Sequence, residues 1–308
     1  GPIGRLRMNP LTLYESGLST GAVSLSGLFE HKFAAAKSEI STQMLLDAVC
    51  RGGWPEAVAL PVSDAQILIR EYMRLTLTES VPRQGKDPDV ARRLLDSLAR
   101  NISQAVTFKT LRKDMYGTEA NLDDFISERT VSGYTAMFEN MFVIDPIKGW
   151  VPPARAPKRL QTKARRYFAD PYIAAAMLGM SPAALIGDWQ TFGFLFENLC
   201  IRDLLVYARS LLDIGIEPVR YYHDDSGLER DAIIELSDGR WGGIEIKSSE
   251  DKVPEAAANL CRLKDKLLRN PSARTREPEF LAVLVGVGEF AYQRDDGVYV
   301  IPVGVLGA

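Results

Sequence analysis

The chain has 308 residues and a formal net charge of −3, with 46% hydrophobic and 25% charged residues. This composition excludes an intrinsically disordered chain and provides enough residues for two or three domains with their own cores. The slightly negative charge argues against a protein whose whole surface binds nucleic acid.

Membrane and disulfide-rich classes are not indicated. No apolar run approaches the roughly 20 residues that cross a bilayer, and no signal peptide begins the sequence. The three cysteines, Cys50, Cys200 and Cys261, form no C-x-x-C pair. We therefore expect a cytoplasmic protein with no membrane partner, whose cysteines are reduced core residues.

Residues 61–153 are predicted to form a helical domain. The expected elements are a helix over 65–78 capped by Asp64, a helix over 88–100, a short helix over 107–115, a longer helix through Val131 and Met141, and a strand over 142–144 ended by Asp145-Pro146. Two helices around a turn followed by a β element are typical of a winged helix-turn-helix. The outward residues of the longer helix would then read DNA: Glu128, Arg129, Ser132 and Thr135. The alternative is a helical interaction or packing module.

The stretch 146–169 is basic and rich in proline, which indicates a linker. It has seven basic residues and no acidic one. Its charge could hold a phosphate backbone ahead of the next domain, although a solvated linker is the alternative. The candidate nucleic-acid contacts are Arg155, Lys158, Arg159, Lys163, Arg165 and Arg166.

A buried helix is predicted over 192–209, because apolar residues surround it on every side. Glu197 is the exception within it. A carboxylate in apolar surroundings is costly unless it is paired or binds a metal. Glu197 is therefore a candidate functional residue.

A strand over 216–222 and a β-hairpin follow this helix. The hairpin runs from 228 to 247, with its turn at Asp238-Gly239. Alternation places Ile244 and Ile246 on one face and Glu245 and Lys247 on the other. Both charged residues could then face Asp231 on the neighbouring strand.

Asp231, Glu245 and Lys247 suit a metal-dependent phosphodiesterase. Mg²⁺ or Mn²⁺ would be held by the two carboxylates, because such hard cations take oxygen ligands and usually need only one or two carboxylates. Lys247 would orient or deprotonate the attacking water or offset charge on the phosphate. An exposed Glu-x-Lys pair with no chemistry is the competing interpretation.

A helix over 254–268 and an apolar strand over 280–287 complete an αβββαβ order. This order, with Glu197 on the first helix, Asp231 on the second strand and Glu245-x-Lys247 on the third, resembles the PD-(D/E)XK or restriction-endonuclease-like superfamily. The resemblance implies that these four residues form a metal and catalytic site, with Glu197 as further metal support. Many relatives on this fold are inactive, so the fold alone does not imply cleavage.

A second resemblance spans nearly the whole chain. Three early segments resemble the later part of the ATPase domain in AAA-type proteins that carry a C-terminal DUF4143 domain: GRLRMNPLTLYESG (4–17), STGAVSL (19–25) and GGWPE (52–56). Later segments resemble DUF4143 itself: YFAD (167–170), FEN (196–198), the Asp231…Glu245-x-Lys247 set and GVYVIPV (297–303). Some members are suspected components of toxin–antitoxin systems.

The sequence departs from this family in lacking a Walker A loop, G-x-x-x-x-G-K-[ST], whose amides and lysine cradle phosphates. We expect no ATP hydrolysis by these residues, and ATP to bind only in a complete protein. The expected reason is a fragment that starts after the nucleotide-binding core, and a degenerate homologue is the alternative.

We therefore predict a multidomain α/β (α+β) chain. Residues 1–60 would be an ATPase remnant, 61–153 a winged-helix-like domain and 154–308 a PD-(D/E)XK nuclease-like DUF4143 domain. The predicted function is metal-dependent binding or cleavage of DNA or RNA, in a chain that could form a homo-oligomer. The alternative is an inactive nuclease-like scaffold that acts as a regulatory or interaction module of an ATPase.

Overall fold

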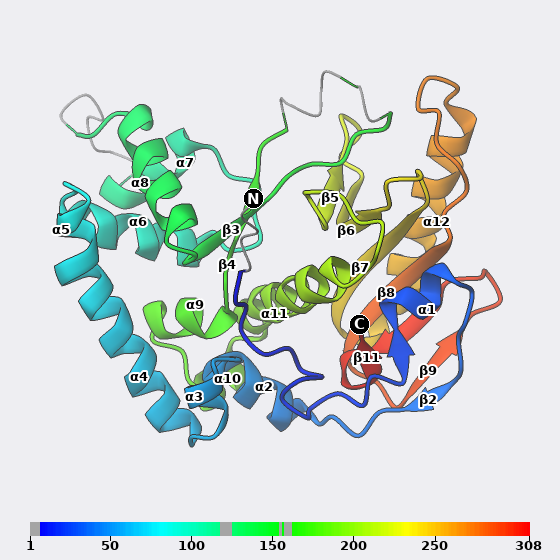
Figure 1. Cartoon of the computed structure of the whole chain (residues 1–308), viewed down its shortest axis with the longest axis horizontal. Helices are drawn as coiled ribbons and strands as arrows, with labels where there is room; N and C mark the ends of the chain where they lie inside the picture. Colours follow the sequence, from blue (N-terminus) through cyan, green and yellow to red (C-terminus); the bar gives the residue numbers. More distant parts are fainter. Residues whose placement is uncertain (1–6, 118–124, 154–155, 157–161) are drawn as a thin grey trace, which may run out of the picture.

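The computed structural model describes residues 7–117, 125–153, 156 and 162–308. It is a mixed α/β protein, as the sequence predicts. In Figure 1 a group of helices occupies one side and a twisted sheet the other, with α11 (Trp189–Arg209) running between them. Among the helices of the described residues, none combines the length and apolarity needed to cross a membrane.

The helical side is built mainly from the first half of the chain. Its helices are α2 (Thr42–Arg51), α3 (Pro55–Val58), α4 (Val62–Leu75), α5 (Val81–Arg83), α6 (Pro88–Arg100), α7 (Phe108–Tyr116), α8 (Glu128–Asn140), α9 (Pro171–Met177) and α10 (Pro182–Gly187). Capping side chains define several starts, since Asp87, Thr107 and Ser127 accept backbone N–H groups at the starts of α6, α7 and α8.

The predicted helix over 65–78 begins earlier and continues further than expected. Its N-cap is Pro61 rather than Asp64. Asp64 lies in the first turn, where its negative charge interacts favourably with the positive end of the helix dipole. A π-helical segment, Thr76–Ser80, connects α4 to α5 without a break in the helical path. Thr135 on α8 also differs from the prediction, because it is buried and its hydroxyl donates to the carbonyl of Val131.

The stretch predicted as a linker contains a β-hairpin. Strand β3 (Ile144–Ile147) pairs antiparallel with β4 (Arg165–Phe168). The Asp145-Pro146 pair, expected to end a strand, lies inside β3, where Pro146 is tolerated because β3 has only one neighbour. The expected domain boundary at 153/154 falls between these two paired strands.

A seven-stranded sheet forms the other side of the molecule. Its strands are, in order across the sheet, β2 (Ala36–Lys37), β9 (Phe290–Gln293), β10 (Tyr299–Pro302), β8 (Phe280–Val287), β7 (Trp241–Ser249), β6 (Glu229–Glu235) and β5 (Arg220–His223). The central pairs β7–β8 and β8–β10 are parallel, and the outer pairs are antiparallel. The strand predicted over 216–222 starts later, at Arg220, and Ile216 is fully exposed.

Two helices cover the two faces of this sheet. Helix α11 packs with Ala282 and Leu284 of β8, whereas α12 (Val253–Arg269) packs with Leu281 and Val283, the alternate residues of that strand. The predicted helix over 254–268 and strand over 280–287 are thereby confirmed. The core of the sheet side is a three-layer arrangement of helix, sheet and helix.

Residues 7–60 add to the same sheet side. Strand β2 pairs with β9, and β1 (Val23–Ser24) pairs in parallel with β11 (Leu306–Gly307) near the end of the chain. A short helix, α1 (Leu25–Phe29), follows β1 and buries Leu25 and Leu28. In Figure 1 these blue segments lie beside the red C-terminal strands.

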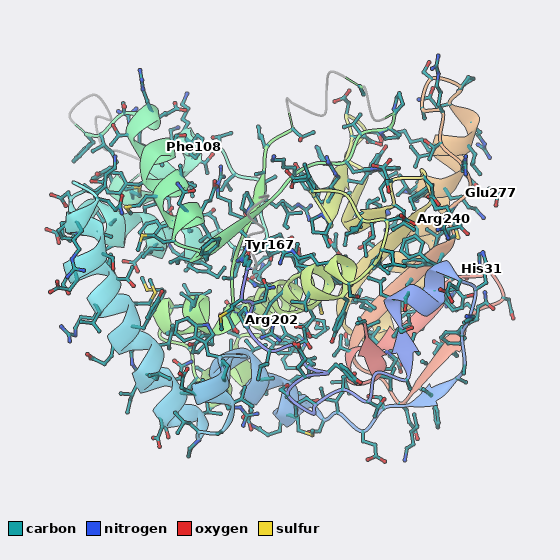
Figure 2. The ribbon with its side chains drawn as sticks, in the orientation of Figure 1. His31, Phe108, Tyr167, Arg202, Arg240 and Glu277 are labelled. Atoms are coloured by element: carbon teal, nitrogen blue, oxygen red, sulfur yellow. The ribbon has the colours of Figure 1, made fainter. Side chains whose placement is uncertain are left out.

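A buried group of charges holds the N-terminal segment onto α11. Arg202, near the centre of the molecule in Figure 2, pairs with Asp203 at 2.7 Å and with Asp170 at 3.2 Å. Asp203 also accepts a hydrogen bond from the amide of Leu13 at 2.9 Å, and Asp170 accepts one from Gly53 at 2.7 Å. Because an unpaired buried charge is strongly destabilising, these bonds specify where the N-terminal segment packs.

Gly53 offers a test of this packing. A Cβ at this position would lie 2.1 Å from the carbonyl oxygen of Leu11 and 3.0 Å from Nη1 of Arg202. We expect Gly53→Ala to lower the free energy of unfolding by about 1–3 kcal/mol through overpacking. Urea unfolding followed by tryptophan fluorescence would measure the change.

The matched control is Gly193→Ala on α11, where an added Cβ meets no atom within 4 Å. That change should leave stability unchanged or raise it by about 0.5–1 kcal/mol, since alanine favours a helix interior. Equal effects of the two substitutions would contradict the proposed packing around Arg202.

Candidate active site

Asp231 lies where β6 separates from β7. The pairing of the two strands begins at Ala232 opposite Ile244, while β7 continues along β8 as far as Ser249. The amide of Ile246 lies beyond that pairing and donates a 2.8 Å hydrogen bond to Oδ2 of Asp231. The Asp231 carboxylate is therefore held in the gap between two diverging strands.

A β-bulge in β6 turns Asp231 toward α11. On β5, Tyr221 is the single residue between two paired positions, whereas β6 has two residues there, Asp231 and Ala232. Such a bulge interrupts the alternation of side chains. Arg230 consequently reaches the α12 side, where it donates to the carbonyl of Asn259, and Asp231 is accessible from the opposite side.

Glu245 and Lys247 lie on the face of β7 that α12 covers, as the predicted alternation requires, while the isoleucines between them pack on the α11 side. Glu245 accepts a 2.9 Å hydrogen bond from Nη1 of Arg230 and a 3.0 Å hydrogen bond from Nζ of Lys247. The same Nζ is 3.8 Å from Oδ2 of Asp231. Lys247 thus connects the two carboxylates.

Glu197 reaches Asp231 from α11. Its Oε1 accepts a 2.7 Å hydrogen bond from the hydroxyl of Tyr167, which lies at the centre of the molecule in Figure 2. Nη1 of Arg165 is 3.8 Å from Oε1 of Glu197 and 3.6 Å from Oδ1 of Asp231. The structure therefore brings the four predicted site residues into one network together with two arginines. We call this network the charged cluster: Glu197, Asp231, Glu245, Lys247, Arg165 and Arg230.

The charged cluster is neutral in formal charge and largely buried. Its three carboxylates are balanced by its three cations, none of which is more than 32% exposed. Arg165 is the most extensively shared, because it also donates to Glu229 at 2.8 Å and stacks 4.7 Å from the ring centroid of Tyr221. Its guanidinium is thus occupied within the protein.

The other predicted phosphate-binding residues differ in how exposed they are. Lys163 is exposed, whereas Arg166 is mostly buried with its guanidinium 4.7 Å from the ring centroid of Phe108. Three of the predicted contacts lie outside the described residues: Arg155, Lys158 and Arg159.

Burial and the nearby charge of Asp231 raise the pKa of two acids of the cluster. Burial, followed by the charge of Asp231, raises the pKa of Glu197 and that of Glu245 to about 8 each. For Lys247, burial acts to lower the pKa, but the charges of Asp231 and Glu245 outweigh it and raise the pKa above its usual value. Glu197 and Glu245 therefore titrate close to neutral pH, and Lys247 stays protonated there.

A cleft of about 1330 Å³ opens onto one side of the cluster. Glu197, Asp231 and Arg165 line it, together with Lys163, residues 103–106 and the end of α12. Glu245 and Lys247 are not among its lining residues. A molecule in the cleft would therefore meet the carboxylates of Glu197 and Asp231 first.

The donor set fits a divalent cation held by two carboxylates. In the described part of the chain, no three side chains among His, Cys, Asp and Glu are arranged to hold one ion. Asp231 and Glu245 nevertheless lie close enough for the charge of one to raise the pKa of the other. Two carboxylates completed by water are a usual Mg²⁺ environment in proteins. Glu197, the third predicted ligand, accepts a hydrogen bond from Tyr167 and forms an ion pair with Arg165.

Of the cations that neutralise the acids, the sequence predicts only Lys247 at the site. Arg165 is predicted as a nucleic-acid contact in a linker, and no role is predicted for Arg230 or Tyr167. The signal for Arg230 is its position beside Asp231 in a strand, where an arginine needs a partner once buried. Nothing local in the sequence indicates that Arg165 folds back onto Glu197, because this contact joins different elements.

Comparison with protein families divides the chain in two. Residues 42–184 match the family described as Domain of unknown function (DUF8612), and residues 192–306 match Domain of unknown function (DUF4143). The chain therefore contains a DUF4143 domain, as the resemblance implies, although the segment 167–170 falls within the DUF8612 match. A search of curated proteins and a search of solved structures each found no match. Glu197, Asp231, Glu245 and Lys247 lie in the DUF4143 match, and Arg165 lies in the other.

Replacement of Arg165 tests the network. We expect Arg165→Met to lower the free energy of unfolding by about 3–5 kcal/mol near pH 8, because it leaves buried carboxylates without their cation. The difference in the free energy of unfolding between the variant and the wild type should be smaller near pH 6. The pKa of Glu197 in the folded protein is about 8 and that in the unfolded chain is near 4.5, so the proton that neutralises Glu197 is retained below pH 8 and lost above it.

Urea unfolding at both pH values would measure this effect. The double variant Arg165→Met/Glu197→Gln should recover part of the loss, because it removes the unpaired acid together with its partner. Arg166→Met is the matched control, because Arg166 pairs with Glu139, which is not part of the cluster. A loss that is independent of pH and not relieved by Glu197→Gln would contradict the network.

Proposed function

We propose that the DUF4143 domain of this chain is a PD-(D/E)XK nuclease-like domain that binds and cleaves nucleic acid. The element order α11, β5, β6, β7, α12, β8 supports it, since this is the αβββαβ order of that superfamily. The observation that carries the proposal is the contact of Lys247 with both Asp231 and Glu245 at the divergence of β6 and β7. Two acids that could hold a metal ion and a lysine beside them are groups that suit metal-dependent phosphodiester hydrolysis.

In this proposal Asp231 and Glu245 hold Mg²⁺ or Mn²⁺. When bound, the ion would supply Lewis-acid stabilisation of the phosphate and lower the pKa of a water molecule. Asp231 is well placed as a ligand because its Oδ2 is oriented by the amide of Ile246. Residues whose rotamers are held in this way give more defined ligand geometry.

Lys247 is assigned the role of a charge stabiliser. Its pKa is raised by the neighbouring carboxylates, so it carries a proton at neutral pH and cannot accept one from water. A fixed ammonium group beside the reacting phosphate would offset the charge that develops in the transition state. Of the two roles that the sequence left open for Lys247, the electrostatic one agrees better with its surroundings.

Glu197 is assigned the role of proton acceptor. It lines the cleft, and its pKa of about 8 lies close to neutral pH, which is the favourable range for proton transfer. Tyr167 orients it by donating to Oε1. The carboxylate therefore has access, orientation and a suitable pKa.

The wider context of this domain is also proposed. Helices α7 and α8 followed by the β3–β4 hairpin have the order of a winged helix, with Glu128 and Arg129 exposed on α8. Thr135 is buried and takes no part in such a surface. The resemblance of the early segments supports an AAA-type ATPase as the setting of the complete protein, which would supply ATP binding and an oligomeric assembly.

A second candidate function is an inactive nuclease-like scaffold that regulates an ATPase or binds its partners. The observation that favours it is the internal neutralisation of all three carboxylates by Arg165, Arg230 and Lys247. A cluster that is already neutral needs no metal for stability. Metal binding and cleavage of nucleic acid are expected of the nuclease and not of the scaffold, so these two measurements distinguish the candidates.

A cleavage assay tests the primary proposal. The chain would be incubated with Mn²⁺ and plasmid DNA, single-stranded DNA or RNA, which also determines the preferred substrate. We expect cleavage of at least one substrate, reduced by about 100-fold or more in Asp231→Asn and in Lys247→Met. Both substitutions keep the approximate size of the side chain, so circular dichroism should show an unchanged fold.

The matched control replaces an exposed acid and lysine pair, Glu30→Gln and Lys32→Met, whose groups are 2.6 Å apart on the surface. This control should cleave as the wild type does. Absence of cleavage in the wild type on every substrate, with and without the metal, would support the scaffold and reject the nuclease.

A further inference from the structure

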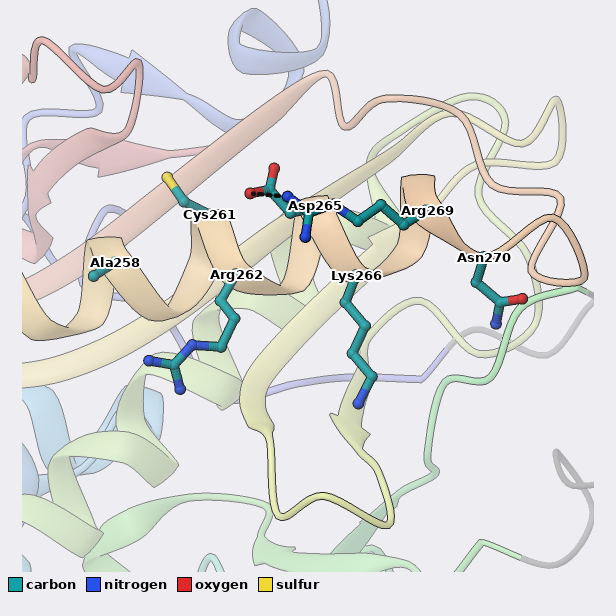
Figure 3. A pocket seen from close by; sticks show the side chains of 7 residues that line it. All are labelled: Ala258, Cys261, Arg262, Asp265, Lys266, Arg269 and Asn270. Carbon is teal, nitrogen blue, oxygen red and sulfur yellow. Dashed lines mark ion pairs between the residues drawn. The ribbon is translucent and has the colours of Figure 1, made fainter.

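Helix α12 carries a basic groove on its outer side. Figure 3 shows Arg262 and Lys266 extending to the same side of the helix, with Arg269 one turn further along. All three line a groove of about 610 Å³. Their spacing of four and three residues places them on one helix face, and they cover about 10 Å of its length.

The groove belongs to a longer basic segment of the sequence, for which the Sequence analysis predicts no function. Residues 262–276 contain six basic residues and one acidic residue, Asp265. The six are Arg262, Lys264, Lys266, Arg269, Arg274 and Arg276. Basic residues in the last turn of a helix are stabilised by the negative end of the helix dipole. That interaction does not explain Arg262, which lies two turns earlier, or Arg274 and Arg276, which lie beyond the helix.

Much of this charge is not engaged by acids of the protein. Arg262 is exposed and, among the residues that the structure describes, makes no ion pair. Arg269 is 3.9 Å from Asp265, and both side chains are more than half exposed, so that the pair contributes little. Lys266 bonds to Asp224 at 2.6 Å and joins α12 to the turn after β5.

The groove is continuous with the cleft at the charged cluster. Lys266 and Asn270 line both the groove and the cleft, and the cleft also includes Lys163 and Asp231. A chain of phosphates lying on α12 would therefore lead toward Asp231.

We infer that the C-terminal half of α12 and the loop after it bind the sugar–phosphate backbone of nucleic acid and direct it into the cleft. A polyanion is the occupant that complements a row of exposed basic side chains with so few acids. Because the contacts are to phosphates, binding is independent of base sequence. Only the direction into the cleft rests on the proposed nuclease function.

The test is binding of a short fluorescein-labelled DNA duplex, measured by fluorescence anisotropy in EDTA over a series of salt concentrations. The double variant Arg262→Ala/Arg269→Ala removes two phosphate contacts. We expect binding to weaken by about 10-fold or more near 0.1 M salt, and the slope of log K against log salt to fall by about 1.8, or roughly 0.9 for each contact.

The matched control, Arg70→Ala/Arg83→Ala, removes two exposed arginines, one from the middle of α4 and one from α5. It should bind as the wild type does. An unchanged slope in the α12 variant, or equal displacement of the duplex by polyglutamate, would overturn the inference. EDTA separates the two proposals, because the backbone surface should still bind when no cleavage occurs, and a cleavage-deficient Asp231→Asn variant should retain the salt slope.

Discussion

The guanidinium of Arg165 is the group on which the arrangement of this protein depends most. It lies between Glu197 of α11 and Asp231 of β6, and it also bonds to Glu229. Glu197 and Asp231 are largely buried, and each would be costly to bury without a cation. Arg165 comes from β4, within the part that matches DUF8612, whereas its partners belong to the DUF4143 domain. One side chain therefore joins the two family regions at the candidate active site.

This connection has a consequence for function. The carboxylates that the proposed nuclease would use are in contact with a residue outside the DUF4143 match, so we expect the position of the β3–β4 hairpin to influence the site. Lys247 connects Asp231 to Glu245 from the other side of the sheet. Asp231 thus forms ion pairs with Arg165 on one side of the sheet and with Lys247 on the other. Its position between two diverging strands allows both contacts. The basic groove of α12 adds a surface on which a phosphate backbone can approach this point.

Much of the local structure could be predicted from the sequence, because regular elements have regular patterns. The apolar residues around α11, the alternation in β7 and the continuous apolar run of β8 each indicate their element. Predictions were weakest where segments distant in the chain pair with each other. Strands β1 and β2 have two residues each and show no periodicity, and the β3–β4 pairing crosses a basic, proline-rich stretch that is typical of a linker. The spacing of Asp231, Glu245 and Lys247 predicts them as site residues, whereas the contacts of Arg165 and Tyr167 with Glu197 are apparent only from the fold.

Calorimetric titration with Mn²⁺ near pH 6 and near pH 8 tests the central claim, that Asp231 and Glu245 together form a site for a divalent cation. Because the pKa of Glu245 is raised to about 8, binding near pH 6 must displace its proton, so affinity should rise with pH and protons should be released into the buffer. Asp231→Asn should abolish the heat of binding at both pH values. No binding by the wild type, or the same binding by Asp231→Asn, would contradict the account.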